Sequence, residues 1–577
     1  MFLRVTNYTM KRLIYLTGLI LIYSYNVLSQ IPINFCGQVF KESFTINKIS
    51  TLNYDISSSG GIHLPSKGYI RALAIFVQFK DDFQEDNNWK LNEIPKWADQ
   101  LSSLITNYFT IMSDSALKLE IDVYPKVVVT DRTQMDYYYD KQNYGAVNKE
   151  VLLKVDQDIS FLPYDNWVQE DKYKIYPGQD NQVDLVFMIY RRLTVLDILK
   201  FYGVSDLGFG WKLPVDNTKR YLWGGNETDH DDASSSGLTV ALAGSGSVMD
   251  LNSAYRLIVH ETLHKLYGEG HPVYNFALLG VLSNSYGSLG MSSFEKAMLG
   301  YLKYKRIDSL KTMEIVLHDY MTTGEAYLIP VPNLPDQFYI LENRQKISPF
   351  DEVKYPGLYI YHLKFNNQYS RLDIQTADGK WDWTLDEHKN VIKAKENPIS
   401  GNSHLEIVKI GNDYYYPPEM EGNKNDPFTI SNKDLYAPWT NPTSNGKWSG
   451  YQDYPTNVYI KIIEEKDGVI KIKLSFNASL LNVNKNDVIA DKYCLFQNYP
   501  NPFNSSTKIN FSIPKSTFIE IKVFDILGRE VKTLVNDFKE SGAYTIDFDA
   551  KGLPGGVYFV SMKADDYKSI KKIVYLK

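Results

Sequence analysis

Residues 259–271 read VHETLHKLYGEGH, and this stretch decides how the largest folded part of the chain is interpreted. His260 and His264 are four residues apart, so on a helix they lie about 40° apart around the axis and both imidazoles can reach one metal ion. Glu261 lies beside them, where its carboxylate can take a proton from a metal-bound water. The spacing therefore predicts a metal site on a helix over 252–267, rather than a surface helix with solvated histidines.

The signals at the two ends of this helix also bear on the site. Asn252 or Ser253 is expected as the N-cap, and Gly268 follows the last helical residue. A catalytic zinc site needs three protein ligands and one open position. His271 is the expected third ligand, because a left-handed turn at Gly268 would bring it back beneath the helix. The alternatives are Glu269 and Glu295. The predicted site is thus His260, His264 and His271 for Zn²⁺, with Glu261 as the catalytic residue.

Outward from the helix, strand and helix patterns alternate. Residues 69–79 (YIRALAIFVQF) and 184–190 (DLVFMIY) are short apolar runs typical of buried strands, and 94–112 has helical spacing. After about residue 306 the helical periodicity fades. Two alternating runs within 458–476 flank Lys-Asp-Gly, which is a hairpin signal. The pattern predicts an α+β fold: a catalytic domain with an active-site helix, then a β-rich domain and a small C-terminal β-sandwich.

The N-terminus has the features of a secretory signal. Lys11 and Arg12 precede an apolar run over 13–28 that is short for a bilayer span, and small residues predict cleavage before Gln30. No later stretch reaches transmembrane length, so no stable membrane span is expected after cleavage. The expected divisions are 1–29 signal peptide, 30–66 N-terminal segment or short pro-region, 67–306 catalytic domain, 307–477 β-rich domain, 478–492 linker and 493–577 C-terminal sandwich.

Composition excludes several classes of protein. The 577 residues are 44% hydrophobic and 23% charged, as in globular proteins with several domains. A net charge of −6 provides no basic field for nucleic acid, so no nucleic-acid partner is expected. The two cysteines, Cys36 and Cys494, make neither a disulfide framework nor a cysteine metal site. One long-range bridge and two buried thiols both remain open.

The histidine motif resembles the metzincin metallopeptidase pattern H-E-x-x-H-x-x-G-x-x-[HD], and its surroundings are similar to secreted bacterial peptidases of the immune inhibitor A family. This likeness covers roughly 68–476 and implies a secreted zinc endopeptidase that hydrolyses proteins or peptides. The similar stretches are RALAIFVQFKDD (71–82), YFTIMSDSALKLEIDVYP (108–125), DLVFMIY (184–190), MSSFEKAMLGYL (291–302), and FYILENRQK with GLYIYHL (338–346 and 357–363).

Two departures from the family pattern concern the site. Gly268 is four residues beyond His264 rather than three, so His271 takes the third-ligand place only if the turn absorbs the extra residue. The segment that resembles the methionine turn beneath the metal, FALLG, places Leu279 where the family has methionine, and Met291 is the less favoured substitute. These departures motivate the alternative that the chain is a non-catalytic surface or adhesion protein on a degenerate peptidase scaffold.

The last block resembles the type A sorting domain of the type IX (Por) secretion system. The resemblance implies passage through the periplasm and outer membrane, contact with the type IX secretion machinery, and a secreted or cell-surface location. The matching stretches are NYPNPFN (498–504), VFDILGREVKTLV (523–535), GVYFVSM (556–562) and KKIVYLK (571–577).

Two further regions offer binding hypotheses. The acidic loop 226–237 (NETDHDDASSSG) could hold a structural Ca²⁺, although it lacks a regular ligand spacing and a solvated loop is the simpler interpretation. The aromatic residues of 411–450 could serve a carbohydrate-binding protein, but rings in such segments more often pack loops over strands. Both hypotheses are less favoured than the peptidase interpretation.

Overall fold

The computed structural model describes residues 61–577 with gaps, and its chain forms two compact units whose main boundary lies between Lys303 and Tyr304. The predicted signal peptide, Cys36 and the predicted linker 478–492 lie outside the described residues. The other gaps are 172–173, 200–201, 226–232, 269–278, 283–287, 308–309, 333, 366–369, 386–390, 397–407, 411–412, 416–423, 439, 447–455, 497 and 499–500.

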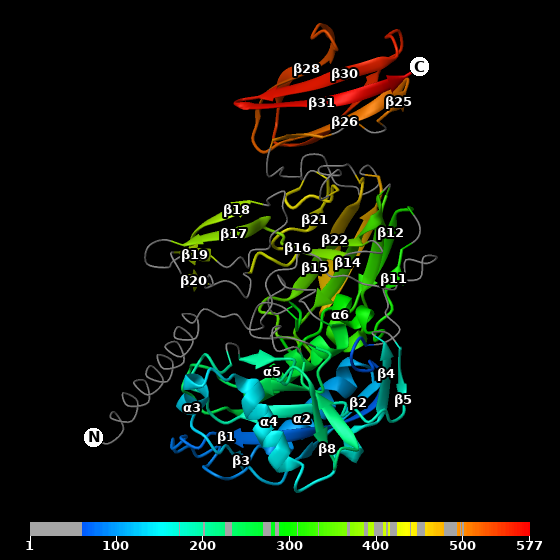
Figure 1. The fold of residues 1–577 in the computed structure, drawn as a ribbon. Coiled ribbons are helices and arrows are strands. Elements are labelled where there is room, and N and C mark those ends of the chain that lie inside the picture. Colours follow the sequence, from blue (N-terminus) through cyan, green and yellow to red (C-terminus); the bar gives the residue numbers. More distant parts are fainter. Residues whose placement is uncertain are drawn as a thin grey trace, which may run out of the picture. The chain divides into compact units, whose positions relative to one another are not determined.

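The first unit is built on a mostly parallel sheet (Figure 1). The order is β2 (Leu117–Val123), β1 (Gly68–Gln78), β6 (Val186–Tyr190), β10 (Gly237–Val240) and β7 (Gly203–Val204), and β3 (Val128–Val129) also pairs with β1. Every pairing is parallel except β10 with β7, which is antiparallel at the edge of the sheet. Strands β1 and β6 are almost wholly buried, as their apolar sequences predict.

Two helices that pack together lie on this sheet. Helix α2 (Ala98–Met112) contacts β2 and α5 (Leu251–Tyr267), and α5 contacts both β10 and the edge strand β7. The predicted site helix is therefore confirmed and lies beside the one antiparallel edge among the described strands of this sheet. The remaining elements of the unit are α3 (Gln134–Tyr139), α4 (Tyr144–Val155), η1 (Leu162–Tyr164), α6 (Ser293–Met298) and the hairpins β4 (Trp167–Asp171) with β5 (Lys174–Pro177) and β8 (Lys212–Val215) with β9 (Arg220–Trp223).

The ends of α5 are fixed by specific hydrogen bonds. The expectation that Asn252 or Ser253 caps the helix is wrong: Asp250 is the N-cap, because its carboxylate accepts the Ser253 N–H at 3.0 Å and the helix already begins at Leu251. At the other end Gly268 ends the helix as expected, but its φ of +81° and ψ of −170° differ from the left-handed turn predicted there. The N–H groups of residues 62 and 63 donate to the carbonyls of residues 266 and 265, each at 3.0 Å.

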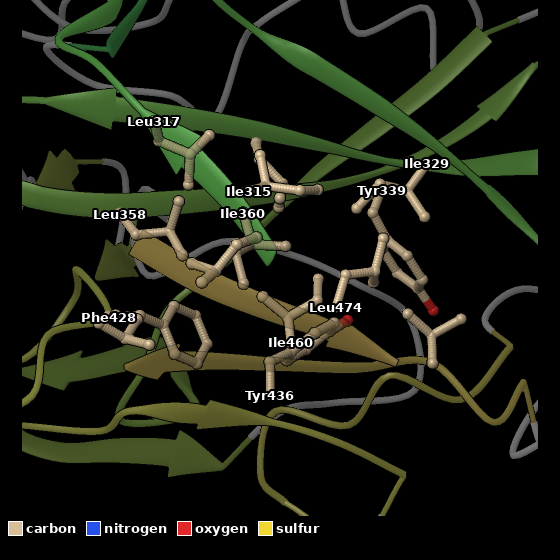
Figure 2. Close-up of a cluster of buried hydrophobic side chains, with 14 of the residues drawn as sticks. Ile315, Leu317, Ile329, Tyr339, Leu358, Ile360, Phe428, Tyr436, Ile460 and Leu474 are labelled. Carbon is tan, nitrogen blue, oxygen red and sulfur yellow. The ribbon is translucent and has the colours of Figure 1, made fainter. Parts of the chain in front are cut away.

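The second unit contains two sheets around a common core, which Figure 2 shows. One sheet has the order β11 (Lys305–Arg306), β13 (Tyr327–Val331), β14 (Leu334–Arg344), β15 (Gly357–Phe365) and β16 (Ser370–Gln375). The other is β12 (Met313–Leu317), β23 (Val469–Ser475), β22 (Tyr459–Lys466) and β21 (Leu435–Tyr436). Side chains such as Ile329, Tyr339 and Ile360 from the first sheet meet Ile460 and Leu474 from the second. The second unit also contains α7 (Tyr320–Thr323). The residues of β17 (Lys380–Leu385) and β18 (Val391–Glu396) are divided between the two units, and β19 (Val408–Ile410) with β20 (Asp413–Tyr415) belongs to the first.

The hairpin between β22 and β23 confirms the turn signal in the sequence. Asp467 and Gly468 both have positive φ, 51° and 77°, which is the geometry of a type I′ turn. The two strands pair antiparallel on either side of this turn, with a register shift between Ile462 and Glu464. The predicted strands at 338–341 and 357–363 also form, within the antiparallel pair β14 and β15.

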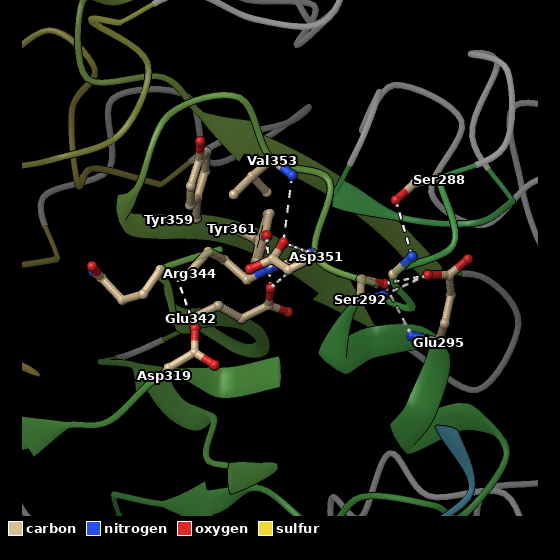
Figure 3. A network of polar contacts seen from close by, with 12 residues as sticks. Ser288, Ser292, Glu295, Asp319, Glu342, Arg344, Asp351, Val353, Tyr359 and Tyr361 are labelled. Atoms are coloured by element: carbon tan, nitrogen blue, oxygen red, sulfur yellow. Dashed lines mark hydrogen bonds and ion pairs between the residues drawn. The ribbon is translucent and has the colours of Figure 1, made fainter. Parts of the chain in front are cut away.

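A buried ion cluster lies in the second unit (Figure 3). The Arg344 guanidinium contacts Asp351 at 2.7 Å and Glu342 at 3.2 Å, and all three side chains are fully shielded from solvent. The Tyr361 hydroxyl donates to Glu342 at 3.0 Å. These contacts neutralise most of the buried charge in β14.

Residues 493–577 form a β-sandwich, as their strand pattern predicts. One sheet is β24 (Cys494–Leu495), β26 (Ser506–Ile513) and β29 (Gly542–Asp549). The other is β25 (Phe503–Asn504), β31 (Tyr567–Leu576), β30 (Gly556–Ala564), β27 (Thr517–Asp525) and β28 (Glu530–Lys539). Alternate residues of the strands, among them Ile519, Ile521 and Val523, fill a core of their own.

Candidate metal site

His260 and His264 point to one place on helix α5. Their Nε2 atoms lie 3.3 Å apart, and the ring planes are inclined by 71°. The side chains are buried, with His260 6% exposed and His264 fully shielded. The histidine pair therefore converges as its i, i+4 spacing predicts, and it does so inside the protein rather than on a solvated helix face.

The donor atoms fit a tetrahedral metal ion. Two Zn–N bonds of about 2.0–2.1 Å at a tetrahedral angle place their nitrogens about 3.3 Å apart, which matches the separation of the two Nε2 atoms. Burial, and then the charge on His260, hold the pKa of His264 well below its usual range. Its ring is therefore neutral near pH 7, and the neutral imidazole is the form that binds metal.

A backbone carbonyl sets the orientation of His260. Its Nδ1 lies 3.1 Å from the carbonyl oxygen of Val281. A carbonyl oxygen only accepts hydrogen bonds, so Nδ1 of His260 carries a proton, and in the neutral form of the ring the lone pair is on Nε2. This is the tautomer that a metal ion at the Nε2 side requires.

Glu261 lies between the helix and the edge strand. Its side chain is 1% exposed, and it is so close to Gly203 of β7 that a Cβ at residue 203 would come within 2.3 Å of Oε1. Only a glycine at this point of the strand leaves room for the carboxylate. The antiparallel edge strand therefore packs directly against the predicted general base.

The predicted third ligand cannot be placed. His271 and its alternative Glu269 lie outside the described residues, as do the acidic residues of the loop 226–237 that could hold Ca²⁺. Within the residues that are described, no group of three or more His, Cys, Asp or Glu side chains could hold a metal ion. The structure thus brings His260 and His264 together beside Glu261, and His271 stays a prediction.

The other alternative ligand, Glu295, is engaged elsewhere. It is fully buried, and both carboxylate oxygens accept hydrogen bonds: Oε1 from the N–H groups of Val281 and Leu282 at 3.0 and 2.8 Å, and Oε2 from the N–H and hydroxyl of Ser292 at 2.7 and 2.8 Å. Figure 3 shows the bonds that Ser292 makes with it. The alternative that Glu295 is the third metal ligand is therefore wrong. Glu295 is instead the N3 residue of a capping box at the start of helix α6.

The two candidates for the methionine-turn position are both in the core. Leu279 is 6% exposed and Met291 is fully shielded. Leucine and methionine have similar volumes, so either residue can fill the apolar space that the methionine turn occupies in the family. Which of them underlies the metal site stays a prediction.

Sequence reasoning missed Lys265, which follows the second histidine. Its ammonium is fully buried and donates to the carbonyls of Ser205 at 2.9 Å and Ser235 at 2.7 Å. Ser205 follows β7 and Ser235 lies two residues before β10, so Lys265 joins the site helix to the segments beside this antiparallel pair of strands. A lysine in a helix is normally exposed to solvent. The only sequence signal for its burial was its position next to His264, a predicted metal ligand.

Comparison with known families places the C-terminal sandwich. Residues 497–576 match the model of the secretion system C-terminal sorting domain of the Por system. The sandwich thus marks the chain for export by the type IX machinery to a secreted or cell-surface location. Among the described residues, no helix combines the length and apolar character needed to cross a membrane.

The comparisons with individual proteins are much weaker. No curated protein sequence matches the chain. One solved structure is PorZ, described as an essential surface component of the type IX secretion system of Porphyromonas gingivalis. It is 12% identical to this chain, the match spans 44% of this chain and 38% of PorZ, and the TM-score is 0.12. A polysaccharide lyase is 10% identical, with 44% and 35% covered and a TM-score of 0.13. The matches span little more than a third of those proteins, and superpositions this poor carry no argument.

Proposed function

We propose that the chain is a secreted zinc-dependent endopeptidase that hydrolyses protein or peptide substrates. The observation that carries the proposal is the 3.3 Å separation of the two Nε2 atoms on α5, with a buried glutamate at the intervening position. The remaining support is the resemblance of the motif to metzincin peptidases of the immune inhibitor A type. His260 and His264, with His271 as the proposed third ligand, would hold Zn²⁺.

The proposed roles follow from the chemistry of the residues. Bound zinc would lower the pKa of a water molecule and polarise the scissile carbonyl. Glu261 would accept a proton from the attacking water and deliver it to the leaving amine. The carboxylate packs against Gly203, and this close contact sets where the base lies before substrate arrives. The Val281 carbonyl keeps His260 in the metal-binding tautomer.

Export by the type IX system is consistent with an extracellular hydrolase. We propose that the sorting domain is of type A, on the basis of the stretches at 498–504 and 571–577. In this proposal the sandwich delivers the chain through the outer membrane and is then removed, leaving the peptidase outside the cell. The linker at 478–492 is the proposed place of removal.

Glu261→Gln tests the catalytic proposal. The variant should keep about one equivalent of zinc but lose casein hydrolysis by a factor of about 10²–10⁴, which is the usual contribution of a general base. Glu93→Gln, which changes an exposed carboxylate of the same unit, is the matched control and should behave as the natural protein. Full activity of Glu261→Gln would refute the role. Less than about half an equivalent of zinc, with no proteolysis at any pH, would favour a non-catalytic protein on this scaffold.

A further inference from the structure

A single peptide group connects Glu295 to His260. The carbonyl oxygen of Val281 lies 3.1 Å from His260 Nδ1, and the N–H of the same peptide group, which belongs to Leu282, donates to Glu295 Oε1 at 2.8 Å. The imidazole, the peptide and the carboxylate therefore form one chain of hydrogen bonds. Val281 and Leu282 are 1% and 0% exposed, so the peptide group in the middle of this series of hydrogen bonds is shielded from water.

We infer that Glu295 is a positioning residue for the proposed metal site, which acts on His260 through the Val281–Leu282 peptide group. The expected effect on zinc binding rests on the proposed function. The effect of Glu295 on the His260 ring does not, because it concerns the metal-free protein. Glu295 fixes where the Val281 carbonyl points, and the carbonyl fixes the tautomer and orientation of the ring.

The electrostatics give this chain a direction. A hydrogen bond to an ionised carboxylate is about twice as strong as one between neutral groups. When the N–H of a peptide donates to a carboxylate, the peptide is polarised and its carbonyl becomes a better acceptor, an effect of roughly 10–30% per bond. The negative charge of Glu295 thus strengthens the hold of the Val281 carbonyl on the His260 Nδ1 proton. The basicity of Nε2 rises as a result.

The surrounding contacts keep Glu295 in place. Ser292 donates its N–H and hydroxyl to Oε2, and the Glu295 N–H donates back to the Ser292 hydroxyl at 3.2 Å. The Tyr267 hydroxyl, in the last turn of α5, donates to the Glu295 backbone carbonyl. Helix α6 is therefore tied to α5 both near the first histidine and at the end of the helix.

A purely structural role for Glu295 would be limited to capping α6, and this is the rival explanation. The two roles involve different bonds: Ser292 of the cap donates to Oε2, whereas the Leu282 N–H of the peptide that touches His260 donates to Oε1. The Val281 N–H is shared between the two oxygens, at 3.0 Å from Oε1 and 3.3 Å from Oε2. Ser292→Ala weakens the cap but leaves the Oε1 bonds in place. Glu295→Gln keeps the size of the side chain but removes the charge that polarises the peptide. The pair of variants separates capping from positioning.

The experiment uses the full chain at pH 8 and has two readouts. In the metal-free protein, ¹⁵N-histidine NMR reports the tautomer of His260 and the shift of its Nδ1 proton. We expect a downfield Nδ1 proton in the natural protein and in Ser292→Ala, and an upfield shift with loss of the single tautomer in Glu295→Gln. Zinc affinity, measured by competition with a chelator, should fall about 10–100-fold in Glu295→Gln and less than about twofold in Ser292→Ala.

The inference is overturned if Glu295→Gln keeps the natural His260 tautomer and proton shift, or if Ser292→Ala lowers zinc affinity as much as Glu295→Gln does. Should no variant bind zinc, the proposed function fails, while the NMR of the metal-free protein still decides the inference. If Glu295→Gln does not fold, Glu295→Asp makes the same comparison, because it keeps the charge but withdraws it by one methylene. It should then show the altered His260 signal.

Discussion

The Nε2 atoms of His260 and His264 lie 3.3 Å apart in a shielded part of the first unit, on successive turns of α5. Two neutral imidazoles whose Nε2 atoms are this close can bind one metal ion. The same helix places Glu261 against Gly203 of the edge strand and the Lys265 ammonium on the carbonyls of Ser205 and Ser235. Each neighbour of the histidine pair therefore leads to a separate test.

Gly203→Ala should impair catalysis without unfolding the protein. The new Cβ would lie 2.3 Å from Glu261 Oε1, and because that atom is the end of a flexible side chain, the carboxylate can move away at little cost in stability. A displacement of about 1 Å at a catalytic group can lower activity about 10²-fold. Casein hydrolysis and zinc content should show lost activity with retained metal. Gly555→Ala, whose Cβ would meet nothing closer than 3.4 Å, is the control. Unchanged hydrolysis in Gly203→Ala would contradict the placement of the base.

The stability of the protein should depend on Glu295 between about pH 4.5 and pH 7. Burial raises the pKa of Glu295 to about 7 from its ordinary 4.5, against the opposing effect of its hydrogen bonds. Between these values the folded state binds more protons than the unfolded state, so this contribution to stability is full below pH 4.5 and is lost as the pH rises to 7. The loss is at most roughly 3 kcal/mol.

This pH dependence is measured as a difference, because other groups also titrate. The free energy of unfolding of the natural protein minus that of Glu295→Gln, followed in denaturant at each pH, should decline from pH 4.5 to pH 7 and then level off. Glutamine does not titrate, so the contributions of all other titrating groups are the same in both proteins and cancel in this difference. A difference that stays constant across this range would show that the buried carboxyl has an ordinary pKa.

Lys265→Met should loosen the edge of the first sheet. The substitution leaves the buried carbonyls of Ser205 and Ser235 without their ammonium donor, at a cost of about 1–3 kcal/mol each. Hydrogen exchange in β7 and β10 should accelerate accordingly. Lys96→Met, at an exposed position of the same unit, should leave exchange unchanged. Equal exchange in the two variants would argue that Lys265 does not hold these strands.

Arg344→Met should destabilise the second unit strongly. It would leave Glu342 and Asp351 as fully buried carboxylates without the guanidinium, which typically costs about 3–5 kcal/mol. Hydrogen exchange in β14 and β15 would report the loss. The exposed pair of Arg529 with Asp525 supplies the comparison, since Arg529→Met should cost less than about 1 kcal/mol. Similar effects of the two substitutions would mean that the buried cluster is not an important source of stability.

The sequence predicted those features that depend on local patterns. The i, i+4 histidines define a helix face, the Asp467–Gly468 turn requires positive φ, and the strands of the sandwich alternate apolar and polar residues. The N-cap of α5 was misplaced by two or three residues, because Asp250 and Ser253 are both good capping residues and only the observed hydrogen bond distinguishes them.

The long-range features of the site could not be obtained in this way. Glu295 is 35 residues from His260 in the chain, and the peptide that joins them has no sequence signature. The capping-box pattern of Ser292 and Glu295 was present in the sequence and could have shown that this carboxylate is engaged. The burial of Lys265 depends on the carbonyls that surround it, which only the fold brings together.

Zinc K-edge X-ray absorption of the purified, exported protein tests the central claim most directly, with His264→Gln as the comparison. The account predicts a four-coordinate zinc whose first shell includes two or more imidazoles at about 2.0–2.1 Å, and a lost imidazole contribution together with lost zinc in the variant. A spectrum without imidazole scattering, or one that His264→Gln leaves unchanged, would contradict a metal ion held between His260 and His264.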